Sequence, residues 1–249
     1  MKSFILNKIF PSVLSLVFIF LLWEIFARAF SSSLVLPFPR DVFKTLFRLL
    51  HTKNFYAHFG FTFLRVVKSF LISITIGFVL GFFSGNFLFL KIFFSLPLSL
   101  VRVTPVVSFI LLAVFWFPSN DVPIFVCVLM TLPIVVSNIA ESFSHRDEKL
   151  LEMAKLYHFS KRQIFFYITL PHSKPFFLSA CVSVFSLSWK VVAAGEVLSL
   201  PHFGIGSLLQ TSSMHLNSNE TFALTILLIL ASFALEKIFH LLFKKWKTI

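Results

Sequence analysis

The sequence predicts an all-α membrane protein, a polytopic bundle of about six transmembrane helices in which residues 1–249 form a single transmembrane domain. Of its 249 residues, 57% are hydrophobic and only 13% are charged, which leaves too little polar surface for a water-soluble globule of this size. The apolar residues fall into six runs, each close to the roughly 20 residues that a helix needs to cross the hydrocarbon core. One charged interval, residues 144–175, separates the fourth run from the fifth.

The first apolar run is expected to be retained as a membrane anchor. It follows Lys2 and Lys8, as a signal peptide would, but it is long for such a segment and no A-x-A-like site precedes Ser31. The six predicted spans are Phe10–Phe30, Val66–Phe83, Pro97–Phe117, Val122–Phe143, Pro175–Glu196 and Thr221–Phe243.

The positive-inside rule predicts the orientation of these spans. An even number of spans places both termini on one side, and the basic residues of the 144–175 interval and of the C-terminal tail favour the cytoplasm. The segment 39–50 disagrees, because its Arg40, Lys44 and Arg48 would lie outside. Its apolar residues recur at helical spacing, so we expect an amphipathic helix on the outer surface of the cell (inner) membrane.

The net charge of +12 does not indicate a nucleic-acid partner. Most basic residues flank apolar runs, where anionic lipid headgroups explain them. The two cysteines, Cys127 and Cys181, each lie inside an apolar run without a neighbouring metal-ligand pattern, so both are expected to be packing residues.

The charged interval predicts two short cytoplasmic helices. Ser144 with Asp147, and Ser160 with Gln163, have the spacing of capping boxes. The first helix is expected over about 145–157, and the second from Lys161 to a point before Pro171, whose ring disfavours helix in the preceding residue. On periodicity alone, an ordinary charged loop fits equally well.

The residues of this interval resemble the EAA motif of ABC importer permeases, written E-A-A-x-x-x-G followed by I-x-L-P. The matching positions are Glu152, Met153, Ala154, His158, Ser160, Ile164, Leu170 and Pro171. In that family the motif forms coupling helices that dock into the ATP-binding subunit, and the resemblance implies the same role here. Two positions depart from the motif: Met153 replaces its second residue, and His158 stands where the family has the glycine that permits a left-handed turn.

Further elements resemble the nitrate, sulfonate and taurine group of these permeases. They are Trp23-Glu24, Leu36–Val42, Leu100–Pro105, and Ser188-Trp189 with Ala194, Glu196 and Gly204–Gly206. The resemblance implies an importer of a small polar or anionic organic solute, with vitamin precursors among the group's cargoes. It also implies a second permease copy as a homodimer partner, cytosolic ATPase subunits that bind ATP and Mg, and an extracytoplasmic solute-binding protein.

Ionisable groups at membrane depth identify weaker candidates for the translocation pathway. Such groups are costly in a bilayer and tend to face a cavity or the bundle interior. Arg102 fits either a structural ion pair or a pathway residue, and Trp189 and Glu196 are further candidates. Gly77 and Gly81 have G-x-x-x-G spacing, which favours packing within the chain over dimerisation.

No enzyme motif is convincing, so we expect no catalytic, metal or cofactor site in this chain. None of the seven glycines precedes a lysine, which excludes a Walker phosphate loop. An ion-coupled secondary transporter remains an alternative, although its candidate carboxylates, Glu24, Glu141 and Glu196, lie near span ends. A membrane enzyme is a weaker alternative, because His145, His158 and His172 with Asp147 fit no common ligand spacing.

Overall fold

The structure is a computed structural model that describes residues 2–30, 32–144 and 148–246, and every regular element in these ranges is helical. This confirms the all-α prediction. In chain order the elements are α1 (Lys2–Phe30), α2 (Pro39–Leu50), α3 (Lys53–Asn86), α4 (Leu88–Val103), α5 (Val106–Trp116), α6 (Val122–Ser144), α7 (Glu148–Leu156), α8 (Lys161–Ile164), the π-helical turn η1 (Phe165–Thr169), α9 (Leu170–Ser199), α10 (Ile205–Met214) and α11 (Ser218–Trp246).

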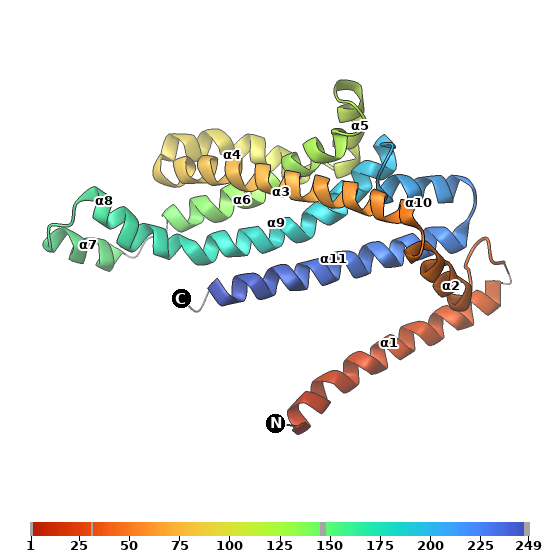
Figure 1. Ribbon diagram of the computed structural model, residues 1–249. Coiled ribbons are helices and arrows are strands. Elements are labelled where there is room, and N and C mark those ends of the chain that lie inside the picture. The colour runs from red at the N-terminus through yellow and green to blue at the C-terminus, as the bar shows by residue number, and fades with distance from the viewer. Residues whose placement is uncertain (1, 31, 145–147, 247–249) are drawn as a thin grey trace.

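Five of these stretches are long and apolar enough to cross a membrane, and the pair α4 and α5 makes a sixth if it counts as one bent span. Figure 1 shows α3, α6, α9 and α11 running along a common axis, with α7 and α8 beyond one end. α1 stands apart from the bundle, and only 6% of its apolar window, residues 13–30, is buried. The predicted span 66–83 is the later part of α3, which begins earlier, at Lys53.

The predicted span Pro97–Phe117 covers the later part of α4 and all of α5, which are bent sharply against each other. α4 and α5 meet at an angle of 102°, and the two residues between them, Thr104 and Pro105, have extended backbone angles. Proline lacks the amide hydrogen that would continue the helix, and its ring pushes the preceding residue out of the helical region. Pro105 therefore turns the chain sharply, and α5 leaves the direction of α4 (Figure 1).

Three glycines bring α3 against α6. A Cβ atom built on Gly77 would lie 2.5 Å from the Cβ of Val135, and one on Gly81 would lie 2.6 Å from the Cβ of Ile139. No side chain fits at such distances, so the two helices approach as closely as G-x-x-x-G spacing allows. The predicted use of Gly77 and Gly81 for packing within the chain is confirmed, and Gly85 continues the same contact against Phe143.

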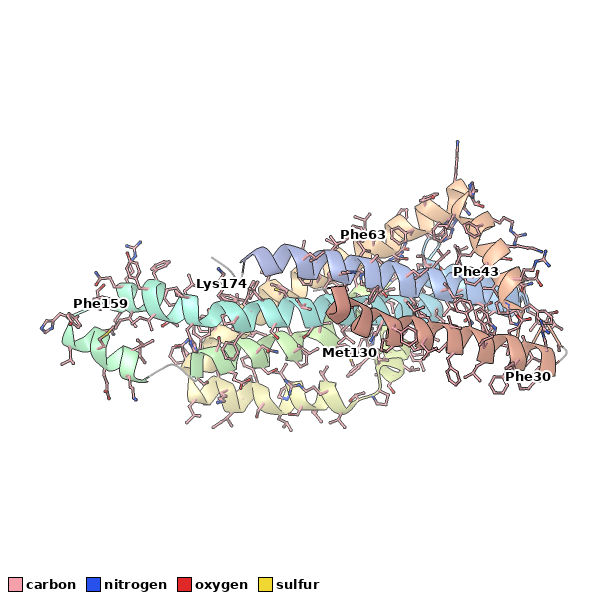
Figure 2. The ribbon with its side chains drawn as sticks, turned by 90° about the horizontal axis from the view of Figure 1, so that it is seen from below. Phe30, Phe43, Phe63, Met130, Phe159 and Lys174 are labelled. Atoms are coloured by element: carbon pink, nitrogen blue, oxygen red, sulfur yellow. The ribbon has the colours of Figure 1, made fainter. Side chains whose placement is uncertain are left out.

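The amphipathic helix predicted at 39–50 is also confirmed. α2 buries Val42 (0% exposed) and Leu46 (6%) in a cluster with residues of α10 and α11, whereas Arg40, Lys44 and Arg48 are exposed. Its position on the outer membrane surface remains a prediction. Figure 2 places Phe43 of this helix near Phe30, at the end of the molecule opposite Phe159 of the α7–α8 connection.

Candidate functional site

The charged interval forms a helical hairpin that projects beyond one end of the bundle. α7 and α8 are joined by a short turn, and Phe159 in this turn lies at the far tip in Figure 2. The predicted capping pair of Ser144 and Asp147, and the expected helix start near His145, depend on residues 145–147, which lie outside the described residues.

His158 makes the turn by adopting a left-handed conformation, with φ of 54°. The amide of Phe159 donates to the carbonyl of Ala154 over 2.9 Å, five residues back, as in the Schellman ending of a helix. The sequence therefore places histidine at a backbone position that favours glycine, and the histidine accepts that geometry.

α8 begins with the predicted capping box. The amide of Gln163 donates to Ser160 Oγ over 3.3 Å, and the amide of Ser160 donates to Gln163 Oε1 over 2.8 Å. These bonds satisfy amides that the first turn of a helix leaves unpaired.

The prediction that this helix ends before Pro171 is wrong. α8 passes through η1 directly into α9, so the chain stays helical from Lys161 to Ser199. In a regular α-turn the ring of Pro171 would clash with the carbonyl four residues earlier. The wider π-turn, in which the Leu170 amide bonds to the Phe165 carbonyl, lets the helix continue past the proline.

α7 presents an apolar face to its surroundings. Leu150, Met153 and Leu156 are 43%, 45% and 79% exposed, and their spacing places them on one side of the helix. Tyr157, directly after the last residue of the helix, is 73% exposed. We call these four residues the α7 face. Large apolar side chains exposed together on a helix outside the spans are typical of a protein interaction surface.

Most of the EAA-like residues are exposed, and two of them are partly or fully buried. Glu152, Met153, His158, Ser160, Leu170 and Pro171 are exposed, Ile164 is partly buried and Ala154 is fully buried. Ala154 therefore packs inside the chain, where it also provides the carbonyl that closes the turn.

A buried polar cluster lies near the other end of the bundle. Glu196 of α9 is completely buried and forms an ion pair with Arg65 of α3, with 2.6 Å between Nη1 and Oε1. The hydroxyl of Thr62 and the amide of Gly206 donate to Glu196 Oε2 over 2.9 and 3.0 Å. Both carboxylate oxygens are therefore satisfied, as a charge at this depth requires.

Arg65 ties further segments into the same cluster. It donates to the carbonyl of Phe203 over 2.6 Å, to the carbonyl of Asn120 over 3.2 Å and to Asn120 Oδ1 over 3.0 Å. The cluster thus joins α3, the connection before α6, α9 and the start of α10. Sequence reasoning missed Arg65 because it began the span one residue later. The polar residues His58, Thr62, Arg65, Ser69 and Ser73 recur every three or four residues and were the available signal.

The three pathway candidates are not brought together. Trp189 is 2% exposed and lies against Phe59 and Phe63, with ring centroids 6.2 Å away in each case. Glu196 is buried in the cluster with Arg65, whereas Arg102 is exposed beside a cavity between α4 and α6. Their roles in a pathway stay predictions.

The structure also locates residues on which the two alternative hypotheses, a secondary transporter and a membrane enzyme, depend. Glu24 pairs with Arg28 on the exposed face of α1, with 2.7 Å between the charged atoms. His145 and Asp147 lie outside the described residues, and within the described ranges no group of three or more histidine, cysteine, aspartate or glutamate side chains could hold a metal ion.

Comparisons with known proteins agree with the membrane-spanning helices and the helical hairpin. Residues 73–247 match the family described as the binding-protein-dependent transport system inner membrane component. A protein of Methanocaldococcus jannaschii, named as an ABC transporter permease, is 22% identical over 194 residues, which cover 76% of this chain and 72% of that protein. The family match includes α7, α8 and α9, and thus the helical hairpin described above.

Proposed function

The chain belongs to the family of binding-protein-dependent transport system inner membrane components, and from this premise we propose that it is the permease subunit of an ATP-driven importer. Family membership carries with it a transmembrane permease role and association with ATPase subunits. The import direction, the solute and the composition of the complex are proposals.

The exposed α7 face is the observation that carries the coupling proposal. Three large apolar side chains on a nine-residue helix, and Tyr157 directly after it, are exposed beyond the spans, which favours a protein partner that covers them. An ATPase subunit is the partner that the family implies. In this proposal Glu152 and Met153 contact the ATPase, Ala154 and His158 hold the shape of the hairpin, and ATP and Mg bind to the ATPase alone.

The continuity of α8, η1 and α9 supports a mechanical route from the ATPase into the membrane. The helical segment from Lys161 to Ser199 begins four residues after Tyr157 of the α7 face and ends three residues after Glu196, which binds Arg65 of α3. Closure of two ATPase subunits on ATP displaces the hairpin, and a stiff helix carries that displacement to the far end of the bundle. Domain rotations of this kind open a pathway to alternate sides.

The solute proposal rests on the resemblance of 36–42 and 188–206 to the nitrate, sulfonate and taurine group. We propose a small polar or anionic organic solute, delivered by an extracytoplasmic binding protein to a pathway formed with a second copy of this chain. A thermal-shift screen of that binding protein against nitrate, taurine, alkanesulfonates, riboflavin and aminopyrimidines tests the class. Stabilisation by peptides, large sugars or metal ions alone would contradict it.

Copurification tests the coupling proposal. The wild-type chain should retain its ATPase in stoichiometric amount, and Leu156→Asp should lose it while remaining in the membrane. The matched control is Met214→Asp, which places the same charge on a side chain that is 63% exposed at the other end of the bundle. Equal ATPase recovery with both variants would remove the α7 face from the proposal.

A further inference from the structure

A groove between α4 and α6 carries charged and hydroxyl side chains that the coupling role leaves unused. Its cavity has a volume of about 260 Å³ and is lined by residues of α3, α4 and α6. α4 contributes Lys91, Ser95, Ser99 and Arg102. These follow one another at intervals of three or four residues, so they form a polar stripe along one side of an otherwise apolar helix.

Both basic side chains of the groove have hydrogen-bond donors available. Arg102 uses Nη2 to donate to the Pro133 carbonyl over 2.8 Å and to Ser137 Oγ over 2.7 Å, which fixes the guanidinium in place. Its Nη1 and Nε have no partner among the described residues. The Lys91 ammonium likewise makes no hydrogen bond or ion pair within the described parts of the chain.

Ser84 of α3 provides independent evidence for a missing acceptor. The residue is only 4% exposed, lines the groove, and its hydroxyl has no hydrogen-bond partner in the part of the chain that the structure describes. A buried hydroxyl without a partner is unfavourable, and native proteins rarely leave one unsatisfied. A ligand oxygen in the groove would supply the acceptor.

We propose that this groove binds an oxyanion headgroup, namely a carboxylate, sulfonate or phosphate group that carries a single negative charge. The guanidinium of Arg102 matches the geometry of such groups, and Lys91 adds a second positive charge. Glu141 also lines the groove. The formal charges of Lys91, Arg102 and Glu141 therefore sum to one positive charge, which suits a monoanion. Phe94 and Leu98 form an apolar wall for a short hydrocarbon portion.

Two sources could provide this headgroup: a small soluble oxyanion or an anionic lipid. Extension of the Lys91 ammonium to the membrane surface would account for that lysine alone. It leaves the unused Nη1 and Nε donors of Arg102 and the unpaired Ser84 hydroxyl unexplained. The inference does not rest on the proposed function, since binding in the groove needs neither an ATPase nor a solute-binding protein.

A thiol-protection experiment tests the site. Ser99→Cys provides a reporter in the groove, and the native Cys127 and Cys181 are buried. Its reaction with an uncharged maleimide is followed in phosphatidylcholine nanodiscs containing sodium ethanesulfonate or sodium chloride at equal ionic strength. Ethanesulfonate should slow labelling several-fold. Lys91→Gln should abolish this protection, whereas the control Lys190→Gln, an exposed lysine of α9, should preserve it.

The lipid arm replaces phosphatidylcholine with phosphatidylglycerol and omits ethanesulfonate. Slower labelling that depends on Lys91 would support the site with a lipid headgroup as its occupant, and protection by ethanesulfonate in neutral nanodiscs would support it with a soluble anion. Arg102→Gln should weaken protection in whichever arm shows it. Labelling that neither reagent slows, or protection that survives Lys91→Gln, would overturn the inference.

Discussion

Replacing Glu196 with leucine is expected to destabilise this protein strongly, because Arg65 would keep its charge without its counterion. The side chains of Arg65 and Glu196 are 6% and 0% exposed, so water cannot replace the lost interaction without opening the bundle. The substitution also removes the acceptor of the Gly206 amide. The loss of a partner by a buried charge is among the few causes of a large decrease in the free energy of unfolding from a single substitution.

The expected loss is about 4 kcal/mol in the free energy of unfolding. Removing one member of a buried ion pair costs about 3–5 kcal/mol. Arg65 retains three acceptors, on Phe203 and Asn120, which keeps the loss below the upper end of that range. For Arg65→Met we expect about 3 kcal/mol, because Glu196 retains the donors of Thr62 and Gly206.

A double-mutant cycle, measured by unfolding in mixed detergent micelles, isolates the interaction energy of Arg65 with Glu196 from their interactions with other residues. The variant with both Arg65→Met and Glu196→Leu should lose at least about 2 kcal/mol less than the sum of the single changes, because neither charge is left alone. Lys44→Met is the control: its pair with Asp41 spans 3.5 Å between exposed side chains, and its loss should stay within about 1 kcal/mol. A loss below about 1 kcal/mol for Glu196→Leu, with additive effects in the cycle, would refute this reasoning.

Three further predictions concern the turn, the helix contact and the topology. His158→Gly should keep ATPase association and raise the free energy of unfolding by no more than about 1 kcal/mol, because glycine adopts φ of 54° without a Cβ penalty. The thermal midpoint should therefore rise slightly. A lower midpoint would show that the imidazole makes its own contact. Gly77→Ala should cost about 1–3 kcal/mol through overpacking, whereas a Cβ on Gly60 meets nothing within 4 Å, so equal unfolding midpoints for the two alanine variants would contradict the packing. Cysteines introduced at the exposed Tyr157 and Met214 should react with impermeant maleimides from opposite sides of the membrane, and labelling of both from the same side would disprove the six-span topology.

The helical framework could be predicted from the sequence where the signal is local. Apolar runs of spanning length predicted the membrane helices, and apolar residues at helical spacing predicted α2. The Ser160 cap was correct for the same reason, since its partner lies three residues away. Each of these features depends on residues within a few turns of one another.

The remaining features depend on tertiary structure. Arg65 and Glu196 are 131 residues apart, and no periodicity links them. The prediction that the helix ends before Pro171 failed because a π-turn widened the backbone, whereas Pro105 produced a sharp bend inside an expected span. Ala154 is fully buried while Glu152 and Met153 beside it are exposed, and the helical spacing of the motif does not determine which of them packs inside the chain.

Site-specific photocrosslinking can show whether an ATPase subunit covers the α7 face. A photoreactive amino acid at Tyr157, 73% exposed on the α7 face, should crosslink in intact membranes to a soluble protein that hydrolyses ATP. The same probe at Met214, 63% exposed at the other end, should give no such product. Crosslinking of Tyr157 to lipid alone, or to the ATPase equally from both positions, would contradict the account.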